Sequence, residues 1–122
     1  MNDLPRSLFE LVPSGIDQQI VEETARQLIK DFAEFSFEIN FTGTKGTPYQ
    51  ELFEQVLPVI ELMLKNNMEM FHAMMYRIDV NEKQIREAMQ RSSSQTFPEV
   101  VTDLILRREM MKVLTKRYFS GK

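Results

Sequence analysis

The chain has 122 residues, of which 43% are hydrophobic and 27% charged, and its formal net charge is −3. This composition is typical of one folded domain and excludes an intrinsically disordered chain of high charge and low hydrophobicity. The lack of cysteine excludes disulfides, thiolate metal sites and cysteine nucleophiles, and a reducing cytoplasm is the default location. We therefore expect a single cytoplasmic domain over residues 1–122.

Export and membrane insertion are both disfavoured by the hydropathy pattern. Residues 1–15 contain Asp3, Arg6 and Glu10, which interrupt the apolar run that a signal peptide requires. The longest apolar run, residues 56–60, is far shorter than the roughly 18 residues needed to cross a bilayer. We expect no membrane segment.

The first predicted element is a helix over residues 14–35, in which apolar residues recur at spacings of three and four. A serine at its first position is the predicted N-cap. Two pairs of opposite charge four residues apart, Glu22 with Arg26 and Lys30 with Glu34, are expected to form ion pairs on its outer face.

Hydrophobic and polar residues then alternate over residues 35–41, with the hydrophobic positions at Phe35, Phe37, Ile39 and Phe41. A period of two is typical of a half-buried strand. No other run alternates comparably, so the segment either pairs with its copy in a second subunit or lies as extended chain on the helices. The second alternative is favoured.

Capping motifs predict where the later helices begin. Thr47–Gln50, Asn81–Gln84 and Thr96–Glu99 each place a capping side chain three residues before a Gln or Glu. Asn66 and Asn67 are expected to end one helix and start the next, over residues 68–77, although one long bent helix also fits. The prediction is an all-α fold of four or five helices, packed as a bundle or array, with one extended segment near residues 36–41.

The last helix is expected to pack inward along one column, formed by Val100, Leu104, Met111, Leu114 and Tyr118. Arg107 falls in the same column. A charge at that position requires a carboxylate partner, or its guanidinium must reach water past the apolar surface.

The only histidine, His72, follows Glu69 in a Glu-x-x-His spacing that places both side chains on one helix face. Helical bundles use this spacing in di-metal sites, but a complete site needs two such motifs and two further glutamates. Glu69 and His72 could therefore bind a metal only across a dimer. An ordinary histidine beside a surface glutamate is favoured, and we expect no cofactor.

The segment Gly43-Thr-Lys-Gly46 could present backbone N–H groups to a phosphate before a helix start. It matches neither the Walker pattern nor the three-glycine dinucleotide fingerprint. A plain turn is favoured.

Surplus apolar surface suggests an interaction role. Five of the nine methionines fall within residues 63–75, and flexible methionine-rich surfaces suit partner binding, although a core role is more common at this spacing. The residues expected to form a contact surface are Phe37, Ile39, Phe41, Met70 and Met74. A homodimer or another protein is the expected partner.

The charges are divided unevenly along the chain. Residues 1–80 carry 13 acidic and 6 basic side chains, whereas residues 81–122 carry 5 acidic and 9 basic ones, so the halves should attract each other. Arg108, Lys112 and Lys116 form a basic ridge on the last helix that could meet nucleic acid. The acidic total and the lack of interleaved aromatic residues disfavour that partner.

No nucleophile with an adjacent base can be identified from the sequence, so enzymatic activity is not expected. The leading hypothesis is a noncatalytic protein-interaction module that associates with itself. The alternatives are a metal-binding helical protein that uses Glu69 and His72 across a dimer, and a weak nucleic-acid binder that uses the basic ridge.

Overall fold

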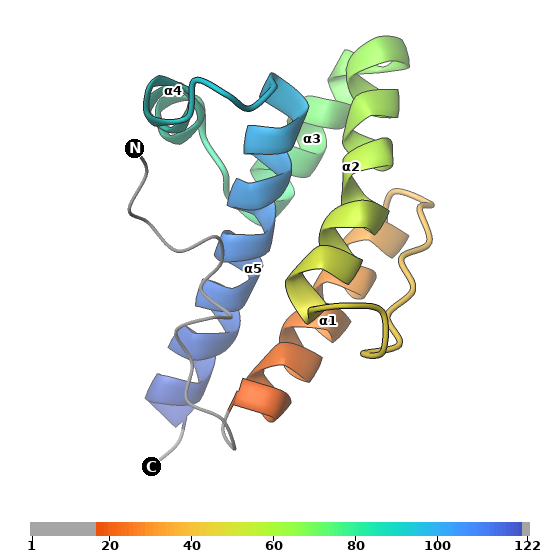
Figure 1. The fold of residues 1–122 in the computed structure, drawn as a ribbon, viewed down its shortest axis with the longest axis vertical. Coiled ribbons are helices and arrows are strands. Elements are labelled where there is room, and N and C mark those ends of the chain that lie inside the picture. Colours follow the sequence, from red (N-terminus) through yellow and green to blue (C-terminus); the bar gives the residue numbers. More distant parts are fainter. Residues whose placement is uncertain (1–16, 121–122) are drawn as a thin grey trace.

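The computed structural model describes residues 17–120, which form five α-helices and no β-strand (Figure 1). The helices are α1 (Asp17–Ala33), α2 (Pro48–Asn66), α3 (Met68–Ile78), α4 (Glu82–Arg91) and α5 (Phe97–Ser120). The predicted all-α fold is confirmed. The predicted N-cap at position 14 and the interrupted apolar run in residues 1–15 lie outside the described residues. No described helix combines the length and the apolar character needed to cross a bilayer.

The three predicted capping boxes are all present. Thr47 Oγ1 accepts a hydrogen bond from the Gln50 N–H at 3.0 Å, and Gln50 Oε1 accepts one from the Thr47 N–H at 3.3 Å. The same reciprocal hydrogen bonds begin α4 at Asn81–Gln84 and α5 at Thr96–Glu99. Each motif satisfies backbone N–H groups that a helix start leaves without an intrahelical partner.

A single residue, Asn67, separates α2 from α3. Its N–H donates to the carbonyl of Met63 at 2.7 Å, and its Oδ1 accepts from the N–H of Met70 at 3.0 Å. Its backbone, at φ −156° and ψ 80°, lies outside the helical region. The predicted stop and restart is therefore confirmed, and the alternative of one long bent helix is wrong.

The alternating segment after α1 lies as extended chain against the helices. Ser36 adopts a left-handed conformation at φ 68°, and the Phe37 N–H donates to the carbonyl of Phe32 at 3.1 Å. Ile39 is buried, and Phe37 and Phe41 are half-buried against the core. Within the single chain, the period of two therefore reflects burial against the helices, and pairing with a second copy stays a prediction.

The core lies where α5 packs against α1 and α2, with α3 and α4 closing one end (Figure 1). Its largest fully buried apolar side chains are Leu28, Phe32, Leu52, Ile60, Met63, Met74, Ile78, Ile105, Leu106 and Met110. Figure 1 shows α4 beside the first turns of α5, whereas α1 lies along its later turns. The two ends of α5 therefore have different neighbours among the described helices.

The column of α5 that was predicted to face inward does so only in part, at its start and at Leu114, which is half-buried against the core. Val100 is buried and Leu104 is half-buried, but Met111 is 43% exposed and Tyr118 is 78% exposed. The core-facing side instead carries Val101, Ile105, Leu106, Met110 and Val113. The prediction failed because α5 carries apolar residues on two opposite sides, and spacing alone does not say which side meets the core.

Candidate functional site

Two carboxylates, Asp31 of α1 and Glu109 of α5, are buried at the interface of these helices, where they are 1% and 0% exposed. We call them the buried acid pair. The Lys112 Nζ joins them, at 3.5 Å from Asp31 Oδ2 and 3.4 Å from Glu109 Oε1. Arg77 of α3 approaches from the other side, with its Nε 3.4 Å from Asp31 Oδ1. Three helices thus contribute charges to one buried cluster.

One proton is expected to remain on the buried acid pair at neutral pH. Burial and the neighbouring Asp31 raise the pKa of Glu109 to about 8, against an ordinary value of 4.5. Both Glu109 oxygens are buried without a hydrogen-bond donor, whereas a protonated Glu109 can itself donate to Asp31. Two buried carboxylates this close cannot both ionise without a large electrostatic cost.

Asp31 is the ionised member of the pair. Burial alone would raise its pKa, but hydrogen bonds from Glu109 and Gln27 and the charges of Lys112 and Arg77 hold that pKa below its usual range. The Gln27 Nε2 donates to Asp31 Oδ1 at 3.2 Å. Since neither carboxyl of the pair reaches solvent, the pair can position Lys112 but cannot contact a substrate in this conformation.

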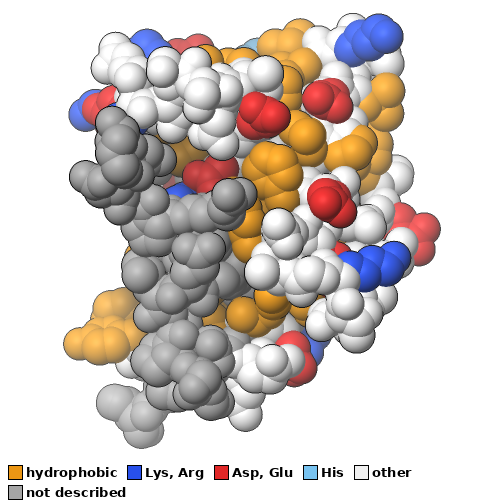
Figure 2. Space-filling model, viewed as in Figure 1, with side chains coloured by type: hydrophobic (Ala, Val, Ile, Leu, Met, Phe, Trp, Pro, Cys, Tyr) orange, Lys and Arg blue, Asp and Glu red, His pale blue; other side chains and the backbone are white. Residues whose placement is uncertain are grey.

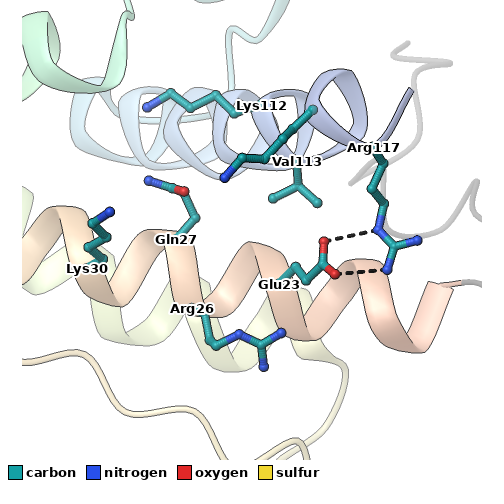
Figure 3. A pocket seen from close by; sticks show the side chains of 8 residues that line it. Glu23, Arg26, Gln27, Lys30, Lys112, Val113 and Arg117 are labelled. Carbon is teal, nitrogen blue, oxygen red and sulfur yellow. Dashed lines mark hydrogen bonds and ion pairs between the residues drawn. The ribbon is translucent and has the colours of Figure 1, made fainter. Parts of the chain in front are cut away.

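A cleft with a volume of about 540 Å³ runs between α1 and α5 beside the buried acid pair (Figure 3). We call it the α1/α5 cleft. Its lining residues are Glu23, Arg26, Gln27 and Lys30 from α1 and Lys112, Val113, Lys116 and Arg117 from α5. Five of the eight are basic and one is acidic, so the cleft is electropositive.

The far end of the cleft is closed by a bidentate ion pair, shown by dashed lines in Figure 3. The Arg117 Nε lies 3.0 Å from Glu23 Oε1, and its Nη2 lies 2.9 Å from Glu23 Oε2. The same Nη2 donates to Gln19 Oε1 at 3.1 Å. The hydrogen bonds from Arg117 hold the pKa of Glu23 below its usual range. Two-point contact fixes the guanidinium plane and so the wall of the cleft.

The outer side of α5 forms a second candidate surface. Met111 is 43% exposed, and Tyr118 and Phe119 are more than 70% exposed and pack edge to face, with their ring centroids 5.1 Å apart. Figure 2 shows hydrophobic side chains in a band between α5 and α2, and a further group at the corner where α5 ends in Figure 1. Exposed apolar side chains that gather in this way are typical of contact surfaces.

The five residues predicted to form an interaction surface belong to the core of the single chain. Ile39 and Met74 are buried, and Phe37, Phe41 and Met70 are half-buried against the core. The methionine-rich helix therefore has one side in the interior while Met68 is 47% exposed, and a contact of these five residues with a partner stays a prediction. The exposed apolar residues of α5 were instead expected to pack inward.

The predicted metal-binding residues, Glu69 and His72, are both exposed near the start of α3, and His72 contacts the ring of Phe71. Within residues 17–120 no group of three or more His, Asp or Glu side chains could hold a metal ion. A metal site that uses Glu69 and His72 thus remains a prediction that needs ligands from a second copy.

The basic ridge on α5 is largely engaged in ion pairs within the chain. The Arg108 Nη2 lies 2.9 Å from Asp79 Oδ2, and Lys112 contacts the buried acid pair. Lys116 lines the α1/α5 cleft. The excess of basic residues in the C-terminal part of the sequence is therefore partly neutralised within the chain. Basic residues of α5 form ion pairs with acidic residues of α1 and with Asp79, which follows α3.

Arg107 has the carboxylate partner that its place in an apolar column required. Its Nε lies 2.7 Å from Asp103 Oδ2, and the Tyr49 hydroxyl donates to Asp103 Oδ1 at 2.5 Å. This contact joins α5 to the first turn of α2.

The loop Gly43-Thr-Lys-Gly46 turns around a carboxylate of its own chain. Glu51 Oε2 accepts from the Thr42 N–H at 2.6 Å and from its hydroxyl at 2.9 Å, and Glu51 Oε1 accepts from the Gly43 N–H at 2.9 Å. Burial opposes ionisation of Glu51, but these hydrogen bonds, together with one from the backbone of Lys45, hold its pKa below the usual range. The N–H groups that could have met a phosphate are thus directed at Glu51.

Replacing Glu51 with alanine is expected to lower the free energy of unfolding by about 2 kcal/mol, because several hydrogen bonds to a charged acceptor are lost. Urea unfolding followed by circular dichroism measures this loss. The matched control is Glu54→Ala, one turn later at an exposed position of α2, which should change stability by less than about 0.5 kcal/mol. Equal effects of the two variants would contradict the assigned role of Glu51.

The buried acid pair and the α1/α5 cleft were both missed by sequence reasoning. Glu109 stands three residues from Leu106 and four from Ile105 and Val113 on the buried side of α5, which was the one available signal. Asp31 follows Leu28 by three residues on a helix whose apolar face was recognised. No protein-family model matches this sequence, and no significant similarity to a curated protein or to a solved structure is found.

Proposed function

We propose that this chain is a noncatalytic interaction module that pairs with a second copy of itself along the outer side of α5. The observation that carries the proposal is the exposed apolar column. Met111, Leu114 and Tyr118 follow one another at spacings of three and four residues, with Met111 and Tyr118 exposed and Leu114 half-buried, and Arg107, which pairs with Asp103, precedes them in the same column. This alternation of three and four residues is the spacing by which one helix packs against another in a coiled coil.

A second copy is the occupant that best fits the chemistry of this face. Over its last two turns the exposed side chains away from the α1/α5 cleft are Met111, Thr115, Tyr118 and Phe119, and none of them is charged, whereas the exposed Lys116 lines the cleft. Two such faces can therefore meet about a twofold axis without bringing like charges together. The face is short, so the association should be weak, with a dissociation constant on the order of tens of micromolar.

The noncatalytic part of the proposal rests on where the perturbed groups lie. Glu109 has a strongly raised pKa, as catalytic acids often do, but it is fully buried and faces Asp31 and Lys112. The arrangement is that of a structural charge cluster.

Light scattering coupled to size-exclusion chromatography, from about 10 to about 500 µM protein, tests the proposal. The average mass of the wild type should rise toward that of a dimer, and the double variant Met111→Glu/Tyr118→Glu should remain monomeric at every concentration. Tyr76→Glu is the matched control, because Tyr76 is 89% exposed but lies on α3.

A wild-type protein that stays monomeric at the highest concentration would refute the proposed dimer. Equal association of the wild type and the double variant would refute the assignment of the surface. Circular dichroism of each variant establishes that the helical fold is retained.

A further inference from the structure

The direction in which two α5 helices would pair depends on Arg107. This residue is the charged member of the column that continues through Met111, Leu114 and Tyr118. Its side chain is 24% exposed, and its Nε lies 2.7 Å from Asp103 Oδ2. A second copy that covers the column therefore also meets the guanidinium group. In a coiled coil, one charged or polar residue at a column position specifies how the two helices align.

A parallel arrangement would bring like charges together. Two parallel helices in register place identical positions face to face, so Arg107 would meet the partner's Arg107. Like charges that face each other across an interface repel, and Asp103 offsets this repulsion only in part. Parallel pairing in register is therefore disfavoured.

An antiparallel arrangement gives Arg107 an aromatic partner. Arg107 lies four residues before Met111, and Tyr118 lies four residues after Leu114. An antiparallel pair that places Met111 opposite the partner's Leu114 therefore also places Arg107 opposite the partner's Tyr118. A twofold axis midway between Met111 and Leu114 repeats both contacts in the second copy. Tyr118 is 78% exposed, so its ring is accessible to another chain.

The two kinds of contact suit the side chains that they join. The face of a tyrosine ring attracts a guanidinium group, and arginine is the cation that most often lies there. This stacking uses the flat face of the guanidinium, so the ion pair between Arg107 and Asp103 at its edge can persist. Met111 against the partner's Leu114 places apolar surface at the centre of the contact.

We propose that two copies of this chain pair through antiparallel α5 helices, with Tyr118 of each copy stacked on the partner's Arg107. This arrangement depends on the self-association proposed above and adds to it the direction of the two helices. It also makes Arg107, the charge that interrupts the apolar column, the residue that determines that direction.

A distance between two spin labels measures the direction. The chain has no cysteine, so a nitroxide on Ser94→Cys labels one position, which is exposed and stands three residues before α5. In the antiparallel dimer the two labels lie at opposite ends of the paired helices, about 45 Å or more apart, because each residue of helix adds about 1.5 Å. In a parallel dimer they lie at the same end, within about 30 Å, because packed helices are about 10 Å apart.

Arg107→Gln tests the contact by the sign of its effect on association. In the antiparallel dimer it removes two stacking contacts, so the dissociation constant should rise by about fivefold or more. In a parallel dimer it would remove a repulsion, and association would tighten. The matched control is Arg86→Gln, which also removes an arginine and its ion pair to a carboxylate four residues away, but on α4. This control should stay within about twofold of the wild type.

A double-mutant cycle establishes that the contact is between copies. Within one chain Arg107 and Tyr118 are eleven residues apart, about 16 Å along the helix, and so cannot stack on each other. The double variant Arg107→Gln/Tyr118→Leu should weaken association about as much as the more damaging single change, because both changes remove the same contact. Effects that multiply would contradict the stacking of these two side chains.

The outcomes separate the direction of the dimer from its existence. A wild type that stays monomeric in light scattering would overturn this arrangement together with the proposed dimer. A dimer with labels within about 30 Å, or one that tightens with Arg107→Gln, would overturn the antiparallel arrangement alone. Circular dichroism of each variant establishes that the helices are retained.

Discussion

Glutamine in place of Glu109 is expected to make the protein more stable than the wild type by a few kcal/mol at pH 8.5, and to change its stability by about 1 kcal/mol or less at pH 5. The amide resembles a protonated carboxyl in shape and can donate to Asp31 as the protonated side chain does. Unlike the carboxyl, it carries no charge at any pH. The variant therefore isolates the proton of the buried acid pair.

The sign follows from the raised pKa of Glu109, about 8 in the fold against 4.5 in the unfolded chain. Below pH 4.5 both states hold the proton, and this group's contribution to stability is fully present. As the pH rises from 4.5 through 8, the unfolded chain releases its proton while the folded chain retains it, so stability is lost. The loss has a ceiling of about 5 kcal/mol.

The partner of Glu109 titrates outside this window. The pKa of Asp31 is lowered, so its contribution to stability is present above its unfolded pKa of 3.8 and is lost only in more acid solution. The other charges that face the pair are those of Lys112 and Arg77. The slope between pH 5 and 8 should therefore belong mainly to Glu109.

Urea unfolding at pH 5, 7 and 8.5 measures the effect. The wild type should become less stable as the pH rises, and Glu109→Gln should show a much flatter profile. The control Glu87→Gln changes an exposed glutamate of α4 and should follow the wild type. Parallel profiles for wild type and Glu109→Gln would show that Glu109 does not retain a proton in the fold.

Met74→Ala is expected to lower the free energy of unfolding by about 2–5 kcal/mol, because it opens a cavity in the core. Met74 is fully buried on α3. Met68→Ala, on the same helix at a position that is 47% exposed, should cost less than about 1 kcal/mol. Urea midpoints at one pH compare the two.

The same pair of variants decides between the two interpretations of the methionine-rich segment. If Met74 were a contact residue between subunits, its replacement would weaken self-association while leaving the unfolding of the monomer nearly unchanged. A large loss of stability without a specific change in association would place Met74 in the core.

The sequence predicted the elements of this fold well because their signals are local. A capping box needs only four consecutive residues, as in Thr47–Gln50, and Asn67 ends one helix and starts the next by hydrogen bonds to residues within four positions. The extended segment was also recognised, since the alternation of Phe37, Ile39 and Phe41 records burial whatever the partner is.

The candidate sites could not be predicted because they depend on contacts between distant residues. Asp31 and Lys112 meet across 81 positions of sequence, and Glu23 meets Arg117 across 94. A long-range contact also replaces one ion pair that was predicted within α1. Glu34 was expected to pair with Lys30 but pairs with Arg77 of α3. The buried side of α5 was predicted wrongly because this helix carries apolar residues on two sides. Only the neighbouring helices determine which of those sides is buried.

The single-residue joint at Asn67 has a consequence for how this chain can change. Because only Asn67 lies between α2 and α3, the length of α2 determines the position and direction of the start of α3. Each residue inserted into or deleted from α2 would advance or retract the joint by about 1.5 Å and rotate it by about 100° about the helix axis. Such a rotation would turn Phe71 and Met74 out of the interior. The number of residues between Thr47 and Asn67 must therefore stay constant for α3 to pack against the core.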